Sequence, residues 1–224
     1  MTRFTGAALT AGAVVLLVFN PLFPRADDPW DVPAVLAMMA ENQALRQTSF
    51  LAVTAGLLAL TAGLVGIQRC LGTVWARLGL YAALVGVTLF AAAAGLGMAA
   101  TGAAVGWVDA GSDVASAEYA IAAALNLADD HVWFWSIITY WTGLGLLGAA
   151  VASHTTFPRW VGLPLAVIGF ATAAFVGVPL AFGVEAPVLL LVFGICGGLT
   201  TVWALAVGIW SLRNPAPVDA SASR

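Results

Sequence analysis

Long blocks of apolar residues divide this chain, and their length is the feature that most limits how it can fold. Runs of about 20 apolar residues, the length that a helix needs to cross roughly 30 Å of hydrocarbon, alternate with short polar stretches. Of the 224 residues, 62% are hydrophobic and only 8% are charged. So few charges could not cover the surface of a water-soluble domain. The pattern therefore predicts an all-α, polytopic membrane bundle.

We expect about six transmembrane helices, over residues 6–23, 48–68, 78–106, 131–153, 160–183 and 187–212. The run 78–106 is longer than one crossing needs, so it is tilted, extends beyond the bilayer or breaks near Gly95 and Gly97. Residues 1–213 then form a single six-helix domain. Residues 214–224 are rich in Pro, Ala and Ser and are expected to form a disordered cytoplasmic tail.

The arginines predict the orientation. All eight basic residues are arginine, and in a six-span arrangement Arg25 and Arg46 alone fall on the side opposite the others. The side rich in arginine carries Arg3, Arg69, Arg77, Arg159, Arg213 and Arg224. Cytoplasmic loops of membrane proteins carry an excess of basic residues. We therefore expect a multi-pass protein of the cell membrane (plasma or inner) with both termini in the cytoplasm.

Two outer stretches are longer than turns. In residues 28–47, Asp31 can cap a helix that Pro33 starts well, and the apolar residues that follow suit a helix lying on the membrane surface. In residues 109–130, apolar residues recur at helical spacing after Asp113, which predicts a second short surface or re-entrant helix.

A cluster of polar residues at the outer start of the fourth expected span is the candidate metal site. It comprises Glu118, Asp129, Asp130 and His131. Carboxylates beside an imidazole can bind a divalent metal or move a proton. A structural interpretation competes and is the stronger one, because acidic residues are stabilised at a helix N-terminus and His is a common interfacial anchor.

Aromatic side chains in the later spans are the candidate ligand-binding residues. They are Tyr140, Phe170, Phe175 and Trp203, with Phe182 and Phe193 beside them in sequence. They could line an apolar cavity for a lipophilic molecule, although core packing accounts for them equally well. Pairs of glycines at G-x-x-x-G spacing, Gly102/Gly106 and Gly194/Gly198, and the set Gly143, Gly145 and Gly148 indicate close helix packing.

Charged residues are missing from the middle of every expected span, and known catalytic motifs are missing as well. Without lysine, the chain cannot form a retinal Schiff base. The favoured hypothesis is a non-catalytic protein that binds a lipophilic ligand or serves as a structural subunit of a membrane assembly. A transporter or channel for a neutral solute, and a membrane enzyme or metal protein with an outer acidic and His site, are the alternatives. The expected partners are the lipid bilayer and a second copy or a larger membrane complex, but not nucleic acid; the cofactor is unknown from the sequence.

Three segments carry a resemblance to known proteins. The GAALTAGAVVLLV opening, the outer D-P-W stretch and the ENQALRQTSF approach to the second span resemble small prokaryotic multi-pass membrane proteins of domain-of-unknown-function type. The resemblance covers most of the chain as topology. It implies a six-span architecture and transfers no functional residue.

Overall fold

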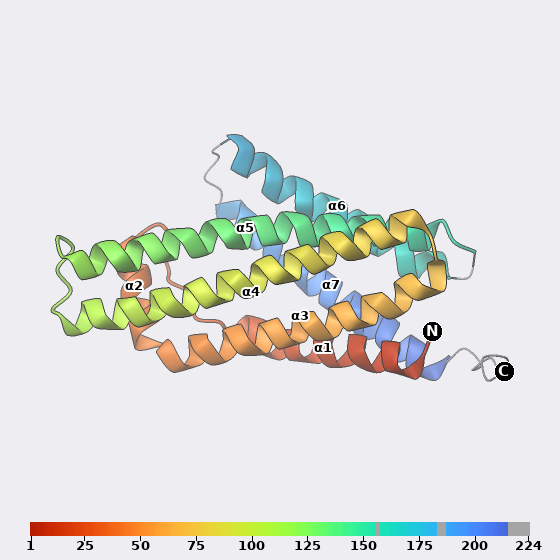
Figure 1. The fold of residues 1–224 in the computed structure, drawn as a ribbon, viewed down its shortest axis with the longest axis horizontal. Helices are drawn as coiled ribbons and strands as arrows, with labels where there is room; N and C mark the ends of the chain where they lie inside the picture. The colour runs from red at the N-terminus through yellow and green to blue at the C-terminus, as the bar shows by residue number, and fades with distance from the viewer. Residues whose placement is uncertain (156, 183–186, 215–224) are drawn as a thin grey trace.

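The computed structural model describes residues 1–155, 157–182 and 187–214, and within them the side chains outside 178–193. This part of the chain is all-α, and its helices run in the order shown in Figure 1: α1 (Arg3–Leu22), α2 (Val32–Glu41), α3 (Gln43–Leu71), α4 (Val74–Asp109), α5 (Ala117–Ala152), α6 (Arg159–Phe182) and α7 (Pro187–Arg213). Every helix except α2 is long and apolar enough to cross a membrane. The predicted fold class, a bundle with six candidate spans, is confirmed. Most of the expected tail, residues 215–224, lies outside the described residues.

Local capping explains where several helices begin and end. The side chains of Thr2, Asp31, Thr73 and Ser116 each accept a hydrogen bond from a backbone N–H of the first turn that follows. Gly72 ends α3 in the left-handed region at φ 65°, directly before the Thr73 cap of α4. The short helix α2 has Asp31 as its cap and proline in its first turn, as predicted.

The two longest helices decide what the sequence left open for residues 78–106 and correct what it predicted for residues 109–130. The second expected surface helix, within 109–130, does not exist as a separate element, because α5 runs without interruption from Ala117 to Ala152. Residues 117–142 contain neither Gly nor Pro, so nothing in this segment interrupts the backbone ladder. Likewise α4 is one unbroken helix across Gly95 and Gly97. Each of these two helices has 36 residues, or about 54 Å at 1.5 Å per residue, well beyond one bilayer crossing.

The six long helices fall into two groups of three, according to where glycines let backbones touch. In the first group α1 packs between α3 and α7: a Cβ atom on Gly12 would lie 2.6 Å from the Gly56 carbonyl oxygen. In the second group α5 packs between α4 and α6: a Cβ atom on Gly79 would lie 2.7 Å from the Leu147 nitrogen. Such contacts exclude any larger residue. The groups meet where α3 packs on α4 and α6 packs on α7.

Only some of the glycines noted in the sequence take part in these contacts. Gly143, Gly145 and Gly148 pack against α4 and α6, as expected. A Cβ atom added at Gly102, Gly106, Gly194 or Gly198 would meet no described atom within 4 Å. Among the described residues these two pairs make no close helix contact, because spacing alone does not tell which side of a helix faces a neighbour.

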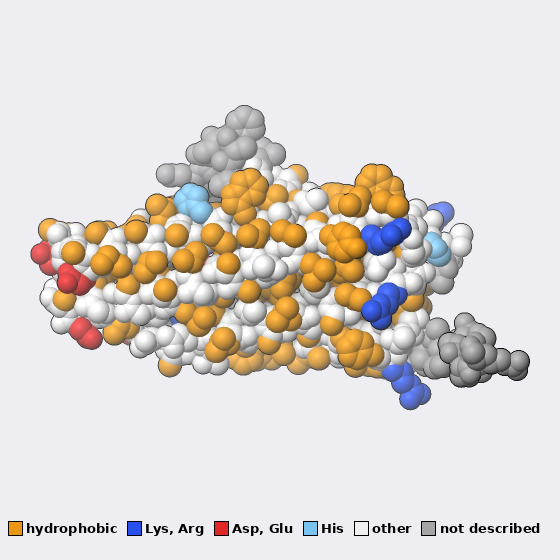
Figure 2. All heavy atoms as spheres, in the orientation of Figure 1, with side chains coloured by type: hydrophobic (Ala, Val, Ile, Leu, Met, Phe, Trp, Pro, Cys, Tyr) orange, Lys and Arg blue, Asp and Glu red, His pale blue; other side chains and the backbone are white. Residues whose placement is uncertain are grey.

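The ends of the molecule differ in charge. Arg3, Arg69, Arg77, Arg159 and Arg213 lie at helix ends that meet near the start of α1 and the end of α7, which we call the inner end. Carboxylates gather at the opposite, outer end, over the tips of α4 and α5 (Figure 2). There α2 packs against α4, and a small outer cluster is buried between α2, α4 and α5: Val35, Leu36, Met39, Ala100, Ala104, Trp107 and Ala122.

Candidate functional site

A cavity of about 760 Å³ lies between the two helix groups in the outer half of the molecule. All six long helices contribute to its wall, and residues 23–30 together with α2 cover its outer end. The volume is within the range of pockets that hold one small ligand. The cavity is therefore the first candidate for a binding site.

The inner part of the cavity is mostly apolar, and its polar lining residues are Asn20, Ser136, Tyr140, Thr200 and Thr201. Its wall is formed by Leu57, Leu60, Val87, Ile137 and Val176. From α7, Thr201 donates a hydrogen bond to the Gly197 carbonyl oxygen at 2.7 Å, as is usual for a helical threonine. The neighbouring Thr200 hydroxyl is buried and has no hydrogen-bond partner among the described residues. This part of the cavity suits an apolar chain and offers it one free hydroxyl.

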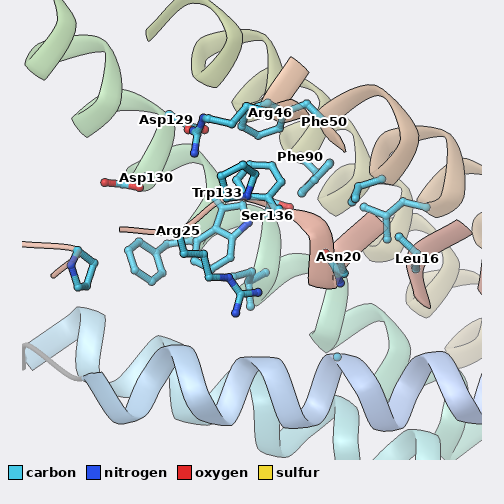
Figure 3. A pocket seen from close by; sticks show the side chains of 18 of the residues that line it. Leu16, Asn20, Arg25, Arg46, Phe50, Phe90, Asp129, Asp130, Trp133 and Ser136 are labelled. Carbon is cyan, nitrogen blue, oxygen red and sulfur yellow. The ribbon is translucent and has the colours of Figure 1, made fainter. Parts of the chain in front are cut away.

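Aromatic rings line the middle of the cavity. Trp133 and Phe134 lie edge to face with ring centroids 5.3 Å apart, and Tyr140 and Trp141 do so at 6.2 Å. All four belong to α5, and Phe90 of α4 lines the same region. In the close view of Figure 3, Trp133 and Phe90 lie between the buried Arg46 and Asp129 on one side and Leu16 on the other, with Asn20 next to Leu16. The aromatic wall thus lies between the two buried charges and the mostly aliphatic part of the cavity.

Arg46 is the central polar residue at the outer end. It stands in the first turn of α3 and its side chain is only 4% exposed. Its Nε donates a hydrogen bond to the Thr101 hydroxyl at 3.3 Å, and the Thr101 hydroxyl donates in turn to the Gly97 carbonyl oxygen at 2.7 Å. The guanidinium carbon lies 4.9 Å from the ring centroid of Phe23 and 5.5 Å from that of Phe50. These contacts hold the cation in a fixed position.

Asp129 of α5 faces Arg46 across the outer end of the cavity (Figure 3). Its side chain is 8% exposed, and its charge interacts with that of Arg46. Gly97 of α4 makes room for this arrangement, because a Cβ atom there would lie 2.8 Å from an Asp129 carboxylate oxygen and 2.5 Å from the Phe50 ring. A buried cation and a buried anion, from two different helix groups, therefore share one end of the cavity.

The structure does not bring the predicted metal-binding residues together. All four lie on α5, but only Asp129 is buried. Asp130 is at the exposed rim of the cavity, and His131 points to the outside, where its Nδ1 lies 2.7 Å from the Leu127 carbonyl oxygen. Glu118 is in the first turn, about 16 Å farther along the helix axis. Among the described residues, no group of three His, Cys, Asp or Glu side chains could hold a metal ion.

The structure does not bring the predicted ligand-binding aromatic residues together at one site either. Tyr140 lines the cavity. Phe170 is 43% exposed and its ring packs over Gly145 of α5, and Phe175 is 60% exposed. Trp203 is buried in the main core, where its Nε1 donates to the Val161 carbonyl oxygen at 2.7 Å. None of these three lines the cavity. The side chains of Phe182 and Phe193 lie outside the described residues.

Sequence reasoning missed Arg46 as a site residue, although a signal was present. Arg25 and Arg46 are the two arginines that depart from the otherwise one-sided distribution, and both line the cavity. Arg46 and Asp129 are buried, because residues 23–30 and α2 cover them. An arginine on the side of a membrane protein that carries few basic residues was therefore the sequence signal for this site.

Comparison with known proteins adds no further guide to function. No family model, no curated protein and no solved structure matches the chain. The resemblance to small prokaryotic membrane proteins stays a prediction.

Proposed function

We propose that this protein is an integral membrane protein that binds a small amphipathic molecule in the cavity between its two helix groups. The observation that carries the proposal is the division of one cavity of about 760 Å³ into a mostly apolar, uncharged inner part and an outer end with a buried Arg46 and Asp129. A purely structural bundle gains nothing from burying two charges beside an open space, because removing charges from water is costly. A ligand with a polar end accounts for both features.

The depth of this polar end agrees with such a ligand. About 20 residues, the length that crosses the hydrocarbon, separate Arg77 at the inner end of α4 from Gly97 beside Asp129. The charged end of the cavity then lies at the level of the outer membrane surface, and the apolar part lies within the bilayer. The ligand would have its polar group at the surface and its apolar chain directed inward, as a membrane lipid has.

Native mass spectrometry of gently extracted protein tests this proposal. We expect the wild type to retain a ligand of defined mass, and Gly197→Phe to lose most of it. Gly197 lines the cavity, and a Cβ atom there meets no described atom within 4 Å, so the new ring can enter the cavity without displacing a described neighbour. Gly198→Phe is the matched control, because a Cβ atom at Gly198 also meets no described atom within 4 Å, but Gly198 does not line the cavity. A wild type without ligand, or equal retention in both variants, would contradict the proposal.

We also propose that the inner end faces the cytoplasm. The arginines at the helix ends of the inner side support this orientation through the positive-inside tendency. Cys70 provides a test, because it is an exposed free cysteine near the inner end of α3. A membrane-impermeant maleimide should label it in opened cells and leave it unlabelled in intact cells, with Cys70→Ser as the background control. Labelling in intact cells would reverse the orientation.

A further inference from the structure

The outer end of the cavity offers two opposite charges with bonding capacity to spare. In the described part of the chain, the Arg46 guanidinium makes a single hydrogen bond, through Nε, so its two terminal nitrogens are available. No described group donates a hydrogen bond to the Asp129 carboxylate. Both side chains are more than nine-tenths buried and border the cavity. Their free positions are accessible from the cavity, where a ligand can satisfy them.

The signs of the charges limit what that ligand can be. An anionic group would bind the terminal nitrogens of Arg46 but would be repelled by Asp129. A cationic group would bind Asp129 but would be repelled by Arg46. A neutral group could hydrogen-bond to either side chain but would offer an opposite charge to neither. A group with an acidic and an ammonium centre satisfies both at once.

The rim of the cavity repeats the same combination of charges. Arg25 and Asp27 of the covering segment and Asp130 of α5 line its outer end. Directly below, the wall becomes aromatic and then aliphatic, ending near Val176 and the free hydroxyl of Thr200. A ligand with a compact polar group and a single apolar chain would match this order of charged, aromatic and aliphatic surfaces.

From this arrangement we propose that the ligand is a single-chain zwitterionic amphiphile, whose acidic group binds Arg46 and whose ammonium group binds Asp129. This inference rests on the proposed function and specifies the chemistry of its ligand. The acid accepts hydrogen bonds from the terminal guanidinium nitrogens, and the ammonium donates to the carboxylate. The chain extends between the helix groups toward α7.

Binding to four probes with hydrocarbon chains of the same length tests the inference. They are a lysophosphatidylethanolamine (zwitterionic), a lysophosphatidylglycerol (anionic), a monoacylglycerol (neutral) and an alkylamine (cationic), each titrated against protein in detergent with the fluorescence of the cavity tryptophans as the signal. We expect the zwitterion to bind about tenfold or more tightly than each of the others, as charge-assisted hydrogen bonds predict. Soluble glycerophosphoethanolamine, added alone, distinguishes a free zwitterion from a lipid: tight binding of this compound would mean that the chain is not needed and would contradict the amphiphile.

Two variants test which side chain binds which charged group of the ligand. Asp129→Asn keeps the size of the side chain and should remove most of the preference for the zwitterion over the anion. Arg46→Gln should remove most of the preference for the zwitterion over the cation. Gel filtration and thermal denaturation show whether each variant is folded, and Arg46→Lys, which keeps the charge, should retain the preference if the Gln variant fails to fold.

The outcomes separate the two proposals. Binding of all four probes with similar affinity, abolished by Gly197→Phe, would overturn the zwitterion and leave the amphipathic cavity in place. Preference for the anion or the cation would also overturn it. Absence of binding by every probe would count against the proposed function itself.

Discussion

The outer cluster and the main bundle share the helices α4 and α5, yet different side chains hold them together. In the bundle, Gly79 and Gly143 bring the two backbones into contact. At the outer end, α2 inserts Leu36 and Met39 between the same two helices, and Trp107 and Tyr119 close the gap with ring centroids 5.5 Å apart. The two regions differ in how the space between one pair of helices is filled.

The surrounding solvent explains this difference. Within a bilayer, lipid tails are as apolar as leucine, so large apolar side chains gain little by leaving them for a helix interface. Close backbone contact through small residues is then the main source of attraction. Beyond the bilayer, water surrounds the helices, and burial of large apolar side chains supplies the free energy. The comparison indicates that α4 and α5 cross from one solvent to the other along their length.

The largest effect should come from filling a glycine contact in the bundle. Gly143→Leu introduces a side chain where the α4 backbone lies, and we expect it to lower the free energy of unfolding by more than about 3 kcal/mol, with little folded protein recovered. Gly194→Leu is the control, because no described atom lies within 4 Å of its Cβ position, and it should behave like the wild type. Thermal denaturation followed by gel filtration measures both. Equal tolerance of the two variants would mean that glycine contact does not hold the bundle.

A smaller and more local effect should follow from cavity creation in the outer cluster. Leu36 is fully buried, so Leu36→Ala should lower the free energy of unfolding of this region by about 2 to 3 kcal/mol. Hydrogen exchange should accelerate in α2 and at the outer ends of α4 and α5, while the inner halves stay protected. Leu45→Ala, at a side chain that is 40% exposed, should change neither the free energy of unfolding nor the rate of hydrogen exchange. Faster exchange throughout the bundle after Leu36→Ala would show that the two regions do not unfold separately.

The smallest effect should occur where the two regions meet. Gly97→Ala places a methyl group against Asp129 and Phe50, which we expect to cost about 1 to 2 kcal/mol of stability and to weaken ligand binding by displacing the carboxylate. Gly95→Ala, two residues earlier with open space at its Cβ position, should leave binding unchanged and stability equal or slightly higher. If Gly97→Ala lowers stability but leaves ligand binding unaltered, Gly97 supports the fold and does not position the carboxylate for the ligand.

Much of the fold follows from the sequence because its causes are local. An apolar run of about 20 residues matches the thickness of the hydrocarbon wherever its neighbours lie, so the six spans could be predicted. Asp31 and Pro33 act within one helical turn, and α2 begins where they place it. The continuity of α5 was also accessible, since no Gly or Pro occurs from 117 to 142, but the change from polar to apolar residues near His131 was taken for a helix end.

Only the tertiary structure decided the site. Asp129, Asp130 and His131 are consecutive, so a helix turns them about 100° apart, and the arrangement of the neighbouring helices determines that Asp129 alone is buried. Arg46 is buried because residues 23–30 and α2 fold over the gap between the two helix groups. The sequence by itself determined which segments can cross a membrane, because that depends on composition and length. Which charges share a cavity depends on contacts between distant segments, and the fold alone brings Arg46 and Asp129 together.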